Sequence, residues 1–379
     1  MIDDQHLLQD DFDTLPDLLA GWRGQWPEMG IWVLLPVAEQ HRIPDIQAVC
    51  RSLDVPLMGA VFPALVSETG FLQRGAWVLR FNHMPASFLL EDMLRPGATQ
   101  DLVKSVQPHL QPLSPQGEAT PTVFLVFDAL LPNIATCLSE LFMHLGSSVG
   151  YSGVNAGSET FQPMPCLFDR DRCVGNGVLG FVLPAATRVV AKHGYPVSRT
   201  EMMATSASGN RVDFINGRPA FDVYREMVGK EYGIDLTHEN FYDYAVHYPL
   251  GLISALDVLV RIPVAFNEDG SLFCVGEVPP YSRLWLLRAP GLEESDCVDQ
   301  IVQTSMVNPP GNSSPLLAFY CAGRRLHFGA EDAAREIVHL QAASGAGPLS
   351  GALSLGEIAT LEEVGFPQFH NACLVCARR

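Results

Sequence analysis

Basic residues are scarce in this chain. Its 379 residues include 24 lysines and arginines against 42 aspartates and glutamates, which gives a formal net charge of −18 at pH 7. A surface of this sign repels the phosphates of nucleic acid and of anionic lipid headgroups. We therefore expect neither a nucleic-acid partner nor membrane insertion.

The sequence also lacks a long uncharged apolar run. The nearest approach, residues 248–266, is interrupted by Asp257 and Arg261 and falls short of the roughly 20 apolar residues of a membrane-spanning helix. The first residues, MIDDQHLLQDDFD, are acidic and do not have the basic, then apolar order of a secretion signal. The 9 cysteines are spread along the chain and are expected to be reduced thiols. These features predict a cytoplasmic protein.

Familiar catalytic motifs are missing too. The stretch 150–159, GYSGVNAGSE, has neither the spacing and lysine of a phosphate-binding loop nor the G-x-G-x-x-G dinucleotide pattern. There is no G-x-S-x-G elbow near its serines and no H-E-x-x-H motif, and the C-x-x-C pair at Cys373 and Cys376 has no second pair. We predict no enzyme, no required cofactor and no metal site. A hydrolase with a serine nucleophile, or with Cys166 or Cys321, remains the alternative.

Length and a hydrophobic content of 47% predict two domains with sizeable cores. After an acidic helical leader, residues 1–27, strand-like and helix-like runs alternate, as in Ile31–Val37, Pro44–Leu53 and Pro56–Phe62. The turn at residues 216–219 divides the rest into domains at 28–215 and 216–379. The predicted fold class is α/β (mixed α+β), each domain being a mixed β-sheet covered by helices, with a cleft between them. Neither half displays a short internal sequence repeat.

The stretch GYSGVNAGSE is rich in glycine and polar residues and follows a predicted helix at Leu131–Leu145. This composition favours a loop, in which Asn155 and Ser158 bind either a ligand or neighbouring backbone groups. His193, at the end of an apolar strand in AKHGYP, is a second candidate. A histidine at such a place contacts a ligand or serves as a capped structural residue.

Three further candidates lie near the carboxyl end of the chain. Arg324 follows the strand LLAFY, Glu357 lies in the apolar segment LGEI, and Asn371 precedes the last strand. Arg324 could clamp a carboxylate, and Glu357 could receive an amino or guanidinium group. The alternative is a structural ion pair between Arg324 and Glu357.

Five stretches occur in an order that resembles the FIST proteins, which pair a FIST N-terminal with a FIST C-terminal domain. They are GYSGVNAGSE, VAKHGYP, NGRPAFDVYREMVG, YCAGRR and GALSLGEIATLEEVGFPQFHN, and the similarity extends from about residue 28 to the end. The resemblance implies a cytoplasmic sensory module for small ligands such as amino acids, associated in bacteria with histidine kinases. Some relatives bind haem and respond to nitric oxide, so a haem-binding sensor with His193 as iron ligand is a second possibility.

We accordingly expect a ligand cleft between the two halves, since small-molecule sites favour domain interfaces. Its predicted lining is Asn155, Ser158, His193, Arg324, Glu357 and Asn371. No kinase, receiver or F-box segment fits in the leading residues, so the signal is expected to pass through a separate partner protein such as a histidine kinase.

Overall fold

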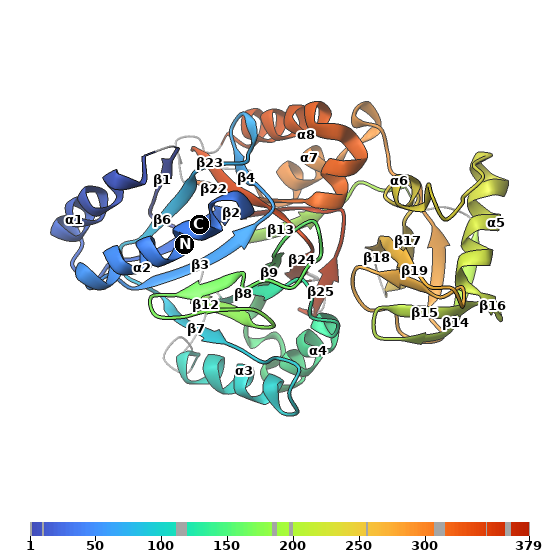
Figure 1. Cartoon of the computed structure of the whole chain (residues 1–379), viewed down its shortest axis with the longest axis horizontal. Coiled ribbons are helices and arrows are strands. Elements are labelled where there is room, and N and C mark those ends of the chain that lie inside the picture. Colours follow the sequence, from blue (N-terminus) through green and yellow to red (C-terminus); the bar gives the residue numbers. More distant parts are fainter. Residues whose placement is uncertain are drawn as a thin grey trace.

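The computed structural model describes residues 2–9, 11–110, 120–183, 188–196, 200–254, 257–306, 315–345, 347–360 and 365–378. Its class is mixed α/β, as predicted. Three 6-stranded sheets form a large body, and a further sheet belongs to an inserted subdomain, residues 200–254 and 257–290, which lies at one end of the molecule (Figure 1). Within the described ranges, no helix is long and apolar enough to cross a membrane.

The body is a threefold structural repeat. The order in each repeat is an edge strand, a helix, a strand, a helix, a parallel strand, a hairpin and a final antiparallel strand. The first repeat contains β1 (Asp4–Leu8), α1 (Leu15–Gln25), β2 (Gly30–Pro36), α2 (Ile43–Ser52), β3 (Leu57–Phe62), β4 (Leu65–Ser67), β5 (Gly70–Leu72) and β6 (Ala76–Phe81). The second contains β7 (Ala86–Leu90), α3 (Ala98–Val106), β8 (Thr122–Asp128), α4 (Ile134–Leu145), β9 (Gly150–Ala156), β10 (Leu167–Asp169), β11 (Cys173–Val174) and β12 (Val178–Leu183).

The third repeat has the same order but is interrupted by the inserted subdomain. It contains β13 (Arg188–Lys192), α7 (Cys297–Ile301), β22 (Leu316–Cys321), α8 (Ala322–Ser344), β23 (Leu349–Ser354), β24 (Glu357–Thr360), β25 (Pro367–His370) and β26 (Leu374–Arg378). Between β13 and α7 the subdomain contributes β14 (Glu201–Ser208), β15 (Arg211–Ile215), β16 (Arg218–Pro219), α5 (Ala220–Tyr232), α6 (Phe241–Ala245), β17 (Leu250–Ser254), β18 (Asp257–Arg261), β19 (Pro263–Phe266), β20 (Leu272–Cys274) and β21 (Arg283–Leu286).

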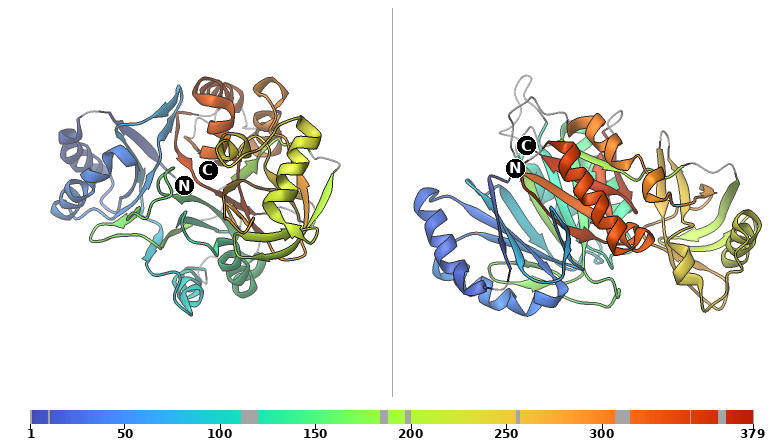
Figure 2. Two further views of the ribbon diagram at one scale, coloured as in Figure 1. Left: turned by 45° about the vertical axis from the view of Figure 1, so that its right-hand side comes forward. Right: turned by 90° about the horizontal axis from the view of Figure 1, so that it is seen from above.

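The repeats exchange their hairpins in a closed ring. β4 of the first repeat pairs with β23 of the third, β10 of the second pairs with β3 of the first, and β24 of the third pairs with β9 of the second. The ring brings the two ends of the chain side by side, as Figures 1 and 2 show. Each sheet is therefore completed by a segment that is distant in sequence.

Aromatic side chains from the three sheets meet at the centre of the body. The ring centroid of Trp32 on β2 lies 5.4 Å from that of Phe124 on β8 and 6.0 Å from that of Phe319 on β22, and all three side chains are buried. The outer faces are covered by helices; for example, α8 packs Ile337 and Leu340 in a core shared with β22 and β23. The body thus has a common inner core and helical outer layers.

The composition of GYSGVNAGSE favoured a loop, but the stretch contains the buried strand β9. Gly153 in this strand is explained by the close approach of β8, because a Cβ at Gly153 would lie 2.0 Å from the carbonyl oxygen of Leu125. Gly351 holds the equivalent place on β23, where a Cβ would lie 1.7 Å from the carbonyl oxygen of Ala318. Packing rather than chain reversal requires these glycines.

The predicted leader and the predicted domain division can be located among the strands and helices. The leader is helical over a 3-10 helix at Phe12–Thr14 and over α1, whereas residues 4–8 form strand β1, which pairs with β6 at the edge of a sheet. The division at 215 and 216 falls between β15 and β16, inside the inserted subdomain, and β13 of the third repeat precedes it. The three repeats lack a visible sequence repeat and are recognisable only from the backbone.

Candidate functional site

The inserted subdomain and the body enclose two adjoining cavities, which we call the cleft. The larger has a volume of about 310 Å³ and the smaller about 110 Å³, and they share the lining residues Phe161, Val264 and Val275. The larger cavity is also lined by Glu159, Tyr242, Val246, Ile262, Cys321, Ala322, Gly323, Arg325, Leu326, Leu355 and Asn371. The cleft is therefore largely apolar with a few polar groups, as small-molecule sites usually are.

Two asparagines in the cleft have buried polar atoms without partners. Asn155, 1% exposed, lines the smaller cavity, and neither its Oδ1 nor its Nδ2 has a hydrogen-bond partner among the described residues. Asn371, also 1% exposed, lines the larger cavity; its Nδ2 donates to the His370 carbonyl at 3.0 Å, while its Oδ1 has no described partner. Buried polar atoms are usually satisfied, so these atoms mark a place where a ligand or water belongs.

Strand pairing fixes the position of Asn155. Its backbone N–H donates to the Gly356 carbonyl at 2.8 Å, and its own carbonyl accepts from Leu355 at 3.1 Å. A Cβ at Gly356 would come within 2.8 Å of the Asn155 Nδ2 atom, so the glycine leaves room for the amide. The hairpin that the third repeat gives to the second sheet thus shapes this part of the cleft.

Glu357 lies close behind the cleft without lining either cavity. It is fully buried, accepts a hydrogen bond from Ser354 Oγ at 2.5 Å, and receives the Cys373 N–H at 3.4 Å. Burial raises the pKa of Glu357 to about 8, against the smaller lowering effect of these hydrogen bonds. The side chain is therefore mostly protonated at neutral pH.

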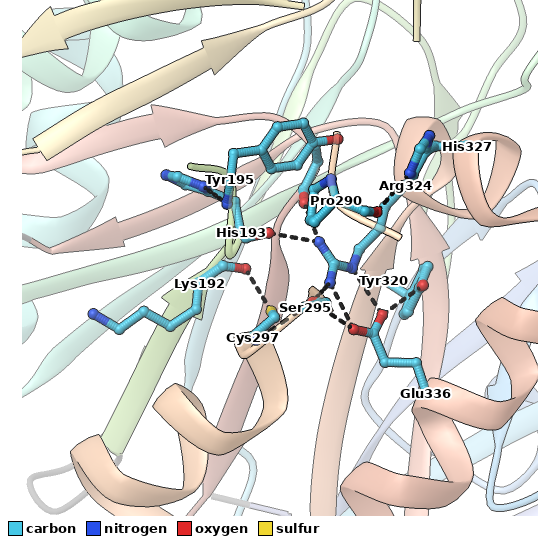
Figure 3. A network of polar contacts seen from close by, with 11 residues as sticks. Lys192, His193, Tyr195, Pro290, Ser295, Cys297, Tyr320, Arg324, His327 and Glu336 are labelled. Atoms are coloured by element: carbon cyan, nitrogen blue, oxygen red, sulfur yellow. Dashed lines mark hydrogen bonds and ion pairs between the residues drawn. The ribbon is translucent and has the colours of Figure 1, made fainter. Parts of the chain in front are cut away.

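Arg324 is fully engaged in a structural network (Figure 3). Its Nε and Nη2 donate to the two carboxylate oxygens of Glu336 at 2.8 and 2.6 Å, and Nη2 also donates to Ser295. Its Nη1 donates to the carbonyls of His193 and Ala372. All five N–H donors are thus used, and the ion-pair partner is Glu336 instead of the expected Glu357.

The carboxylate of Glu336 is as buried as its partner. It is 2% exposed and also accepts a hydrogen bond from Tyr320 Oη at 2.7 Å. Burial alone would raise the pKa of Glu336, but Arg324 and its hydrogen bonds lower it below the ordinary value. The pair is therefore ionised and geometrically well matched.

His193 lines a separate cavity of about 440 Å³, together with Lys192, Asp296 and His370. Its Nδ1 accepts the Tyr195 N–H at 2.9 Å, and its Nε2 lies 3.0 Å from the Val258 carbonyl, to which it donates in the matching tautomer. Both ring nitrogens are engaged, so iron ligation would break one of these bonds. The residues present do not fit a haem held by His193.

The remaining candidates are one serine and two cysteines. Ser158 lies beyond the end of β9, where its Oγ accepts the Thr160 N–H at 3.2 Å in a local turn, and it lines neither cavity of the cleft. Cys321 lines the larger cavity and Cys166 is buried elsewhere; burial raises the pKa of both thiols. Within the described ranges, no group of three or more His, Cys, Asp or Glu side chains is placed to hold a metal ion.

Comparison with protein families gives two matches. Residues 33–218 match the FIST N domain, and residues 220–360 match the FIST C domain. The chain is a FIST protein. No curated protein matches it in sequence.

Both FIST domains contribute to the cleft. Asn155 and Phe161 come from the FIST N domain, Val264, Cys321 and Leu355 from the FIST C domain, and Asn371 lies beyond the matched residues. The third repeat also spans both matched ranges, because β13 lies in the first and β22 in the second. In this FIST protein the site is a joint product of the two domains.

Arg325, a cation that lines the larger cavity, is not among the residues predicted from the sequence. Its guanidinium lies 5.2 Å from the Phe71 ring centroid, and its Nη1 lies 3.8 Å from Glu159 Oε1. Its Nε is buried and has no hydrogen-bond partner among the described residues. The pair of consecutive arginines at 324 and 325 could have indicated it. Neighbouring side chains at the start of a helix point in different directions, so only one of the two can join the buried ion pair.

Proposed function

We propose that this FIST protein is a sensory protein that binds a small ligand in the cleft and signals through a separate partner, such as a histidine kinase. The observation that carries the proposal is the pair of buried asparagines, whose three unpartnered polar atoms belong to side chains that line the two adjoining, largely apolar cavities of the cleft. Unmet hydrogen bonds in a preformed cavity favour a ligand that supplies them.

The polar groups of the larger cavity favour an amino acid as the ligand. The unpartnered Nε of Arg325 can donate to a carboxylate, while the Asn371 Oδ1 and the Glu159 carboxylate can accept from an ammonium group. Apolar side chains, including Ile262, would pack against the remainder of the ligand. A volume of about 310 Å³ is at the lower end for small-molecule pockets, which suits a ligand of this size.

The proposed mechanism is closure of the inserted subdomain on the body. Walls of the cleft belong to both parts, since Val264 lies on β19 and Leu355 on the body, so a ligand that contacts both favours the closed arrangement. Such a ligand can shift the equilibrium only by its difference in affinity for the two arrangements, typically about 1–3 kcal/mol. The altered surface would then change the activity of the partner.

Ligand binding rather than catalysis is proposed because the thiol in the cleft is poorly suited to nucleophilic attack. Burial raises the pKa of Cys321, and this effect outweighs the lowering by the Ala372 N–H, which donates to its Sγ at 3.1 Å. A thiol of this kind remains protonated at neutral pH, whereas reactive cysteines have lowered pKa values. Slow alkylation of Cys321 by iodoacetamide at pH 7 is the expected result.

A thermal-shift screen with the twenty amino acids tests the proposal. A ligand at 100 times its Kd should stabilise the protein by about 2.7 kcal/mol. Asn371→Leu and Arg325→Gln should each weaken binding at least tenfold, which is about 1.4 kcal/mol. Ser158→Ala, at a turn outside the cleft, is the matched control and should bind normally.

Two results would overturn the proposal. One is that no amino acid shifts the melting temperature. The other is that an amino acid binds with equal affinity to the wild type and to folded Asn371→Leu and Arg325→Gln variants, which would place its site elsewhere. The signalling part is tested separately, by measuring autophosphorylation of a histidine kinase that copurifies with the protein, with and without the ligand.

A further inference from the structure

A second buried arginine lies outside the cleft and has no acidic partner. Arg261, on β18, is 1% exposed and forms no ion pair with a carboxylate among the described residues. Its Nε donates to the Glu277 carbonyl at 2.9 Å, and its Nη1 donates to the carbonyls of Val260 and Phe369. Backbone carbonyls hold this guanidinium in place, and the Glu277 carboxylate acts on its charge only through space, without a direct contact.

The free part of the guanidinium lies at a groove. Nη2 of Arg261 has no acceptor among the described residues, and Arg261 lines a groove of about 630 Å³ between α4 of the body and strands β17 and β18 of the inserted subdomain. Burial lowers the pKa of Arg261 to about 10, so the group remains cationic at neutral pH. A fixed cation with a free donor is a binding group for an anion.

The acidic residues of the groove limit the charge of that anion. Glu277 accepts hydrogen bonds from the Thr136 N–H at 3.0 Å and the Thr136 hydroxyl at 2.5 Å, so its carboxylate is committed to the first turn of α4. Glu140 and His144 on α4 are the other titratable side chains that line the groove. Two carboxylates would repel a phosphate dianion more strongly than a singly charged ligand.

The remaining walls favour an apolar ligand body. Apolar side chains line the groove from both sides: Ala135, Met143, Leu252, Ile253, Leu259, Pro279 and Phe366. Leu252 and Leu259 lie opposite each other in the register of β17 and β18. The volume is within the range of about 300–1,000 Å³ that accommodates small organic molecules.

We propose that this groove is a second ligand site, which binds a small monocarboxylate with an apolar body. The carboxylate accepts from Nη2 of Arg261, and the apolar body packs against β17, β18 and the exposed side chain of Met143. The site is separate from the cleft, because its lining residues include none of those that line either cavity of the cleft.

Titration of the full-length protein with matched acid and amide probes tests this proposal. The probes are hexanoate, benzoate, phenylacetate and indole-3-acetate, each paired with its neutral amide, with inorganic phosphate as a further probe; calorimetry and amide NMR shifts report binding. At least one carboxylate should bind saturably and at least tenfold more tightly than its amide and than phosphate. If no carboxylate binds, or if each amide binds equally well, the proposal is overturned.

Variants locate the binding. Arg261→Gln should weaken carboxylate binding at least tenfold. Because this substitution could disturb folding, the exposed position Met143, 83% exposed, supplies an independent pair: Met143→Glu should weaken binding severalfold through charge repulsion, and Met143→Gln should not. Equal binding by Met143→Glu and Met143→Gln would overturn the proposal.

The cleft variant Arg325→Gln separates the two sites. It should leave carboxylate binding in the groove unchanged while it weakens amino-acid binding in the cleft. If Arg325→Gln instead abolishes carboxylate binding, the probe occupies the cleft and the groove site is rejected, whereas the proposed sensory function is unaffected.

Discussion

Breaking the Arg324–Glu336 pair should destabilise the protein strongly without removing a ligand contact. In Arg324→Met, the carboxylate of Glu336, 2% exposed, loses its two charged hydrogen bonds and keeps only neutral partners. Removing one member of a buried ion pair typically costs about 3–5 kcal/mol. The free energy of unfolding, from urea denaturation followed by circular dichroism, should fall by that amount at pH 7.

The pH dependence of the stability difference between Arg324→Met and the wild type shows whether the buried charge of Glu336 causes the destabilisation. In the wild type, Arg324 holds the pKa of Glu336 below its ordinary value, so the contribution of this pair is lost only as the pH falls through that lowered pKa. Without Arg324, burial should raise the pKa of Glu336 above its unfolded value. The folded variant then binds a proton that the unfolded chain does not, so the stability difference from wild type should shrink between pH 7 and pH 5.

Control variants in the same helix separate the loss of the buried ion pair from the loss of an arginine as such. Arg335, also on α8, forms ion pairs with Asp332 and Glu293 at the surface, and Arg335→Met should change stability little. The double variant Arg324→Met/Glu336→Leu should regain part of the lost stability, since no buried charge remains. The reasoning is refuted if Arg324→Met is as stable as Arg335→Met, or if the double variant is no better than the single one.

Three further predictions follow from the same structure. The wild type should lose stability as the pH rises from about 5 to 8, because the raised pKa of Glu357 near 8 means that the folded state holds a proton that the unfolded chain has released. Glu357→Gln cannot titrate at this position and should not show that loss. Denaturation curves at several pH values check this. Gly351→Ala should destabilise by about 1–3 kcal/mol or more, since its Cβ would meet the Ala318 carbonyl at 1.7 Å, whereas Gly21→Ala on α1, with nothing within 4 Å, should be neutral or slightly stabilising. Both ring nitrogens of His193 are engaged in hydrogen bonds, so added haemin should give no shift of the Soret band that depends on His193. A Soret shift that occurs in the wild type and is lost in His193→Ala would contradict this.

Periodicity predicted much of the local structure but not the architecture. The strand and helix runs at β2, α2 and β3 are confirmed, because each carries its own apolar pattern. The ring of exchanged hairpins has no such local signal. β4 finds its partner β23 almost 300 positions away, and only the assembled core decides that pairing.

The site was predictable in residue type more than in arrangement. Asn155 borders the smaller cavity and Asn371 the larger one, and their role in ligand binding stays a prediction. Arg324 was expected to bind a ligand or Glu357, but its partner is Glu336, twelve residues later and beyond a break at Gly329, where φ is 79°. The helical pattern does not continue across that break, so the spacing gave no warning of the pair.

The threefold repeat offers a reason why the cleft lies where it does. The strands β2, β8 and β22 end at equivalent places, opposite the ends of their parallel partners. In the first repeat the residue at this place is Pro36, which has no N–H to donate. In the second repeat it is Asp128, whose carboxylate accepts hydrogen bonds from the backbone N–H groups of Leu130 and Asn176. In the third it is Cys321, which faces the larger cavity.

The inserted subdomain accounts for this difference between the repeats. It interrupts the third repeat alone, and its residues Tyr242, Val246, Ile262 and Val264 cover the cavity at Cys321. The body therefore supplies the charged side chains and the two unpartnered asparagines, and the insertion supplies much of the apolar wall. Substitutions in that wall, such as Val264→Ala, should change which amino-acid side chain is accepted, while the proposed contacts of Arg325 with the carboxylate and of Asn371 with the ammonium group stay the same.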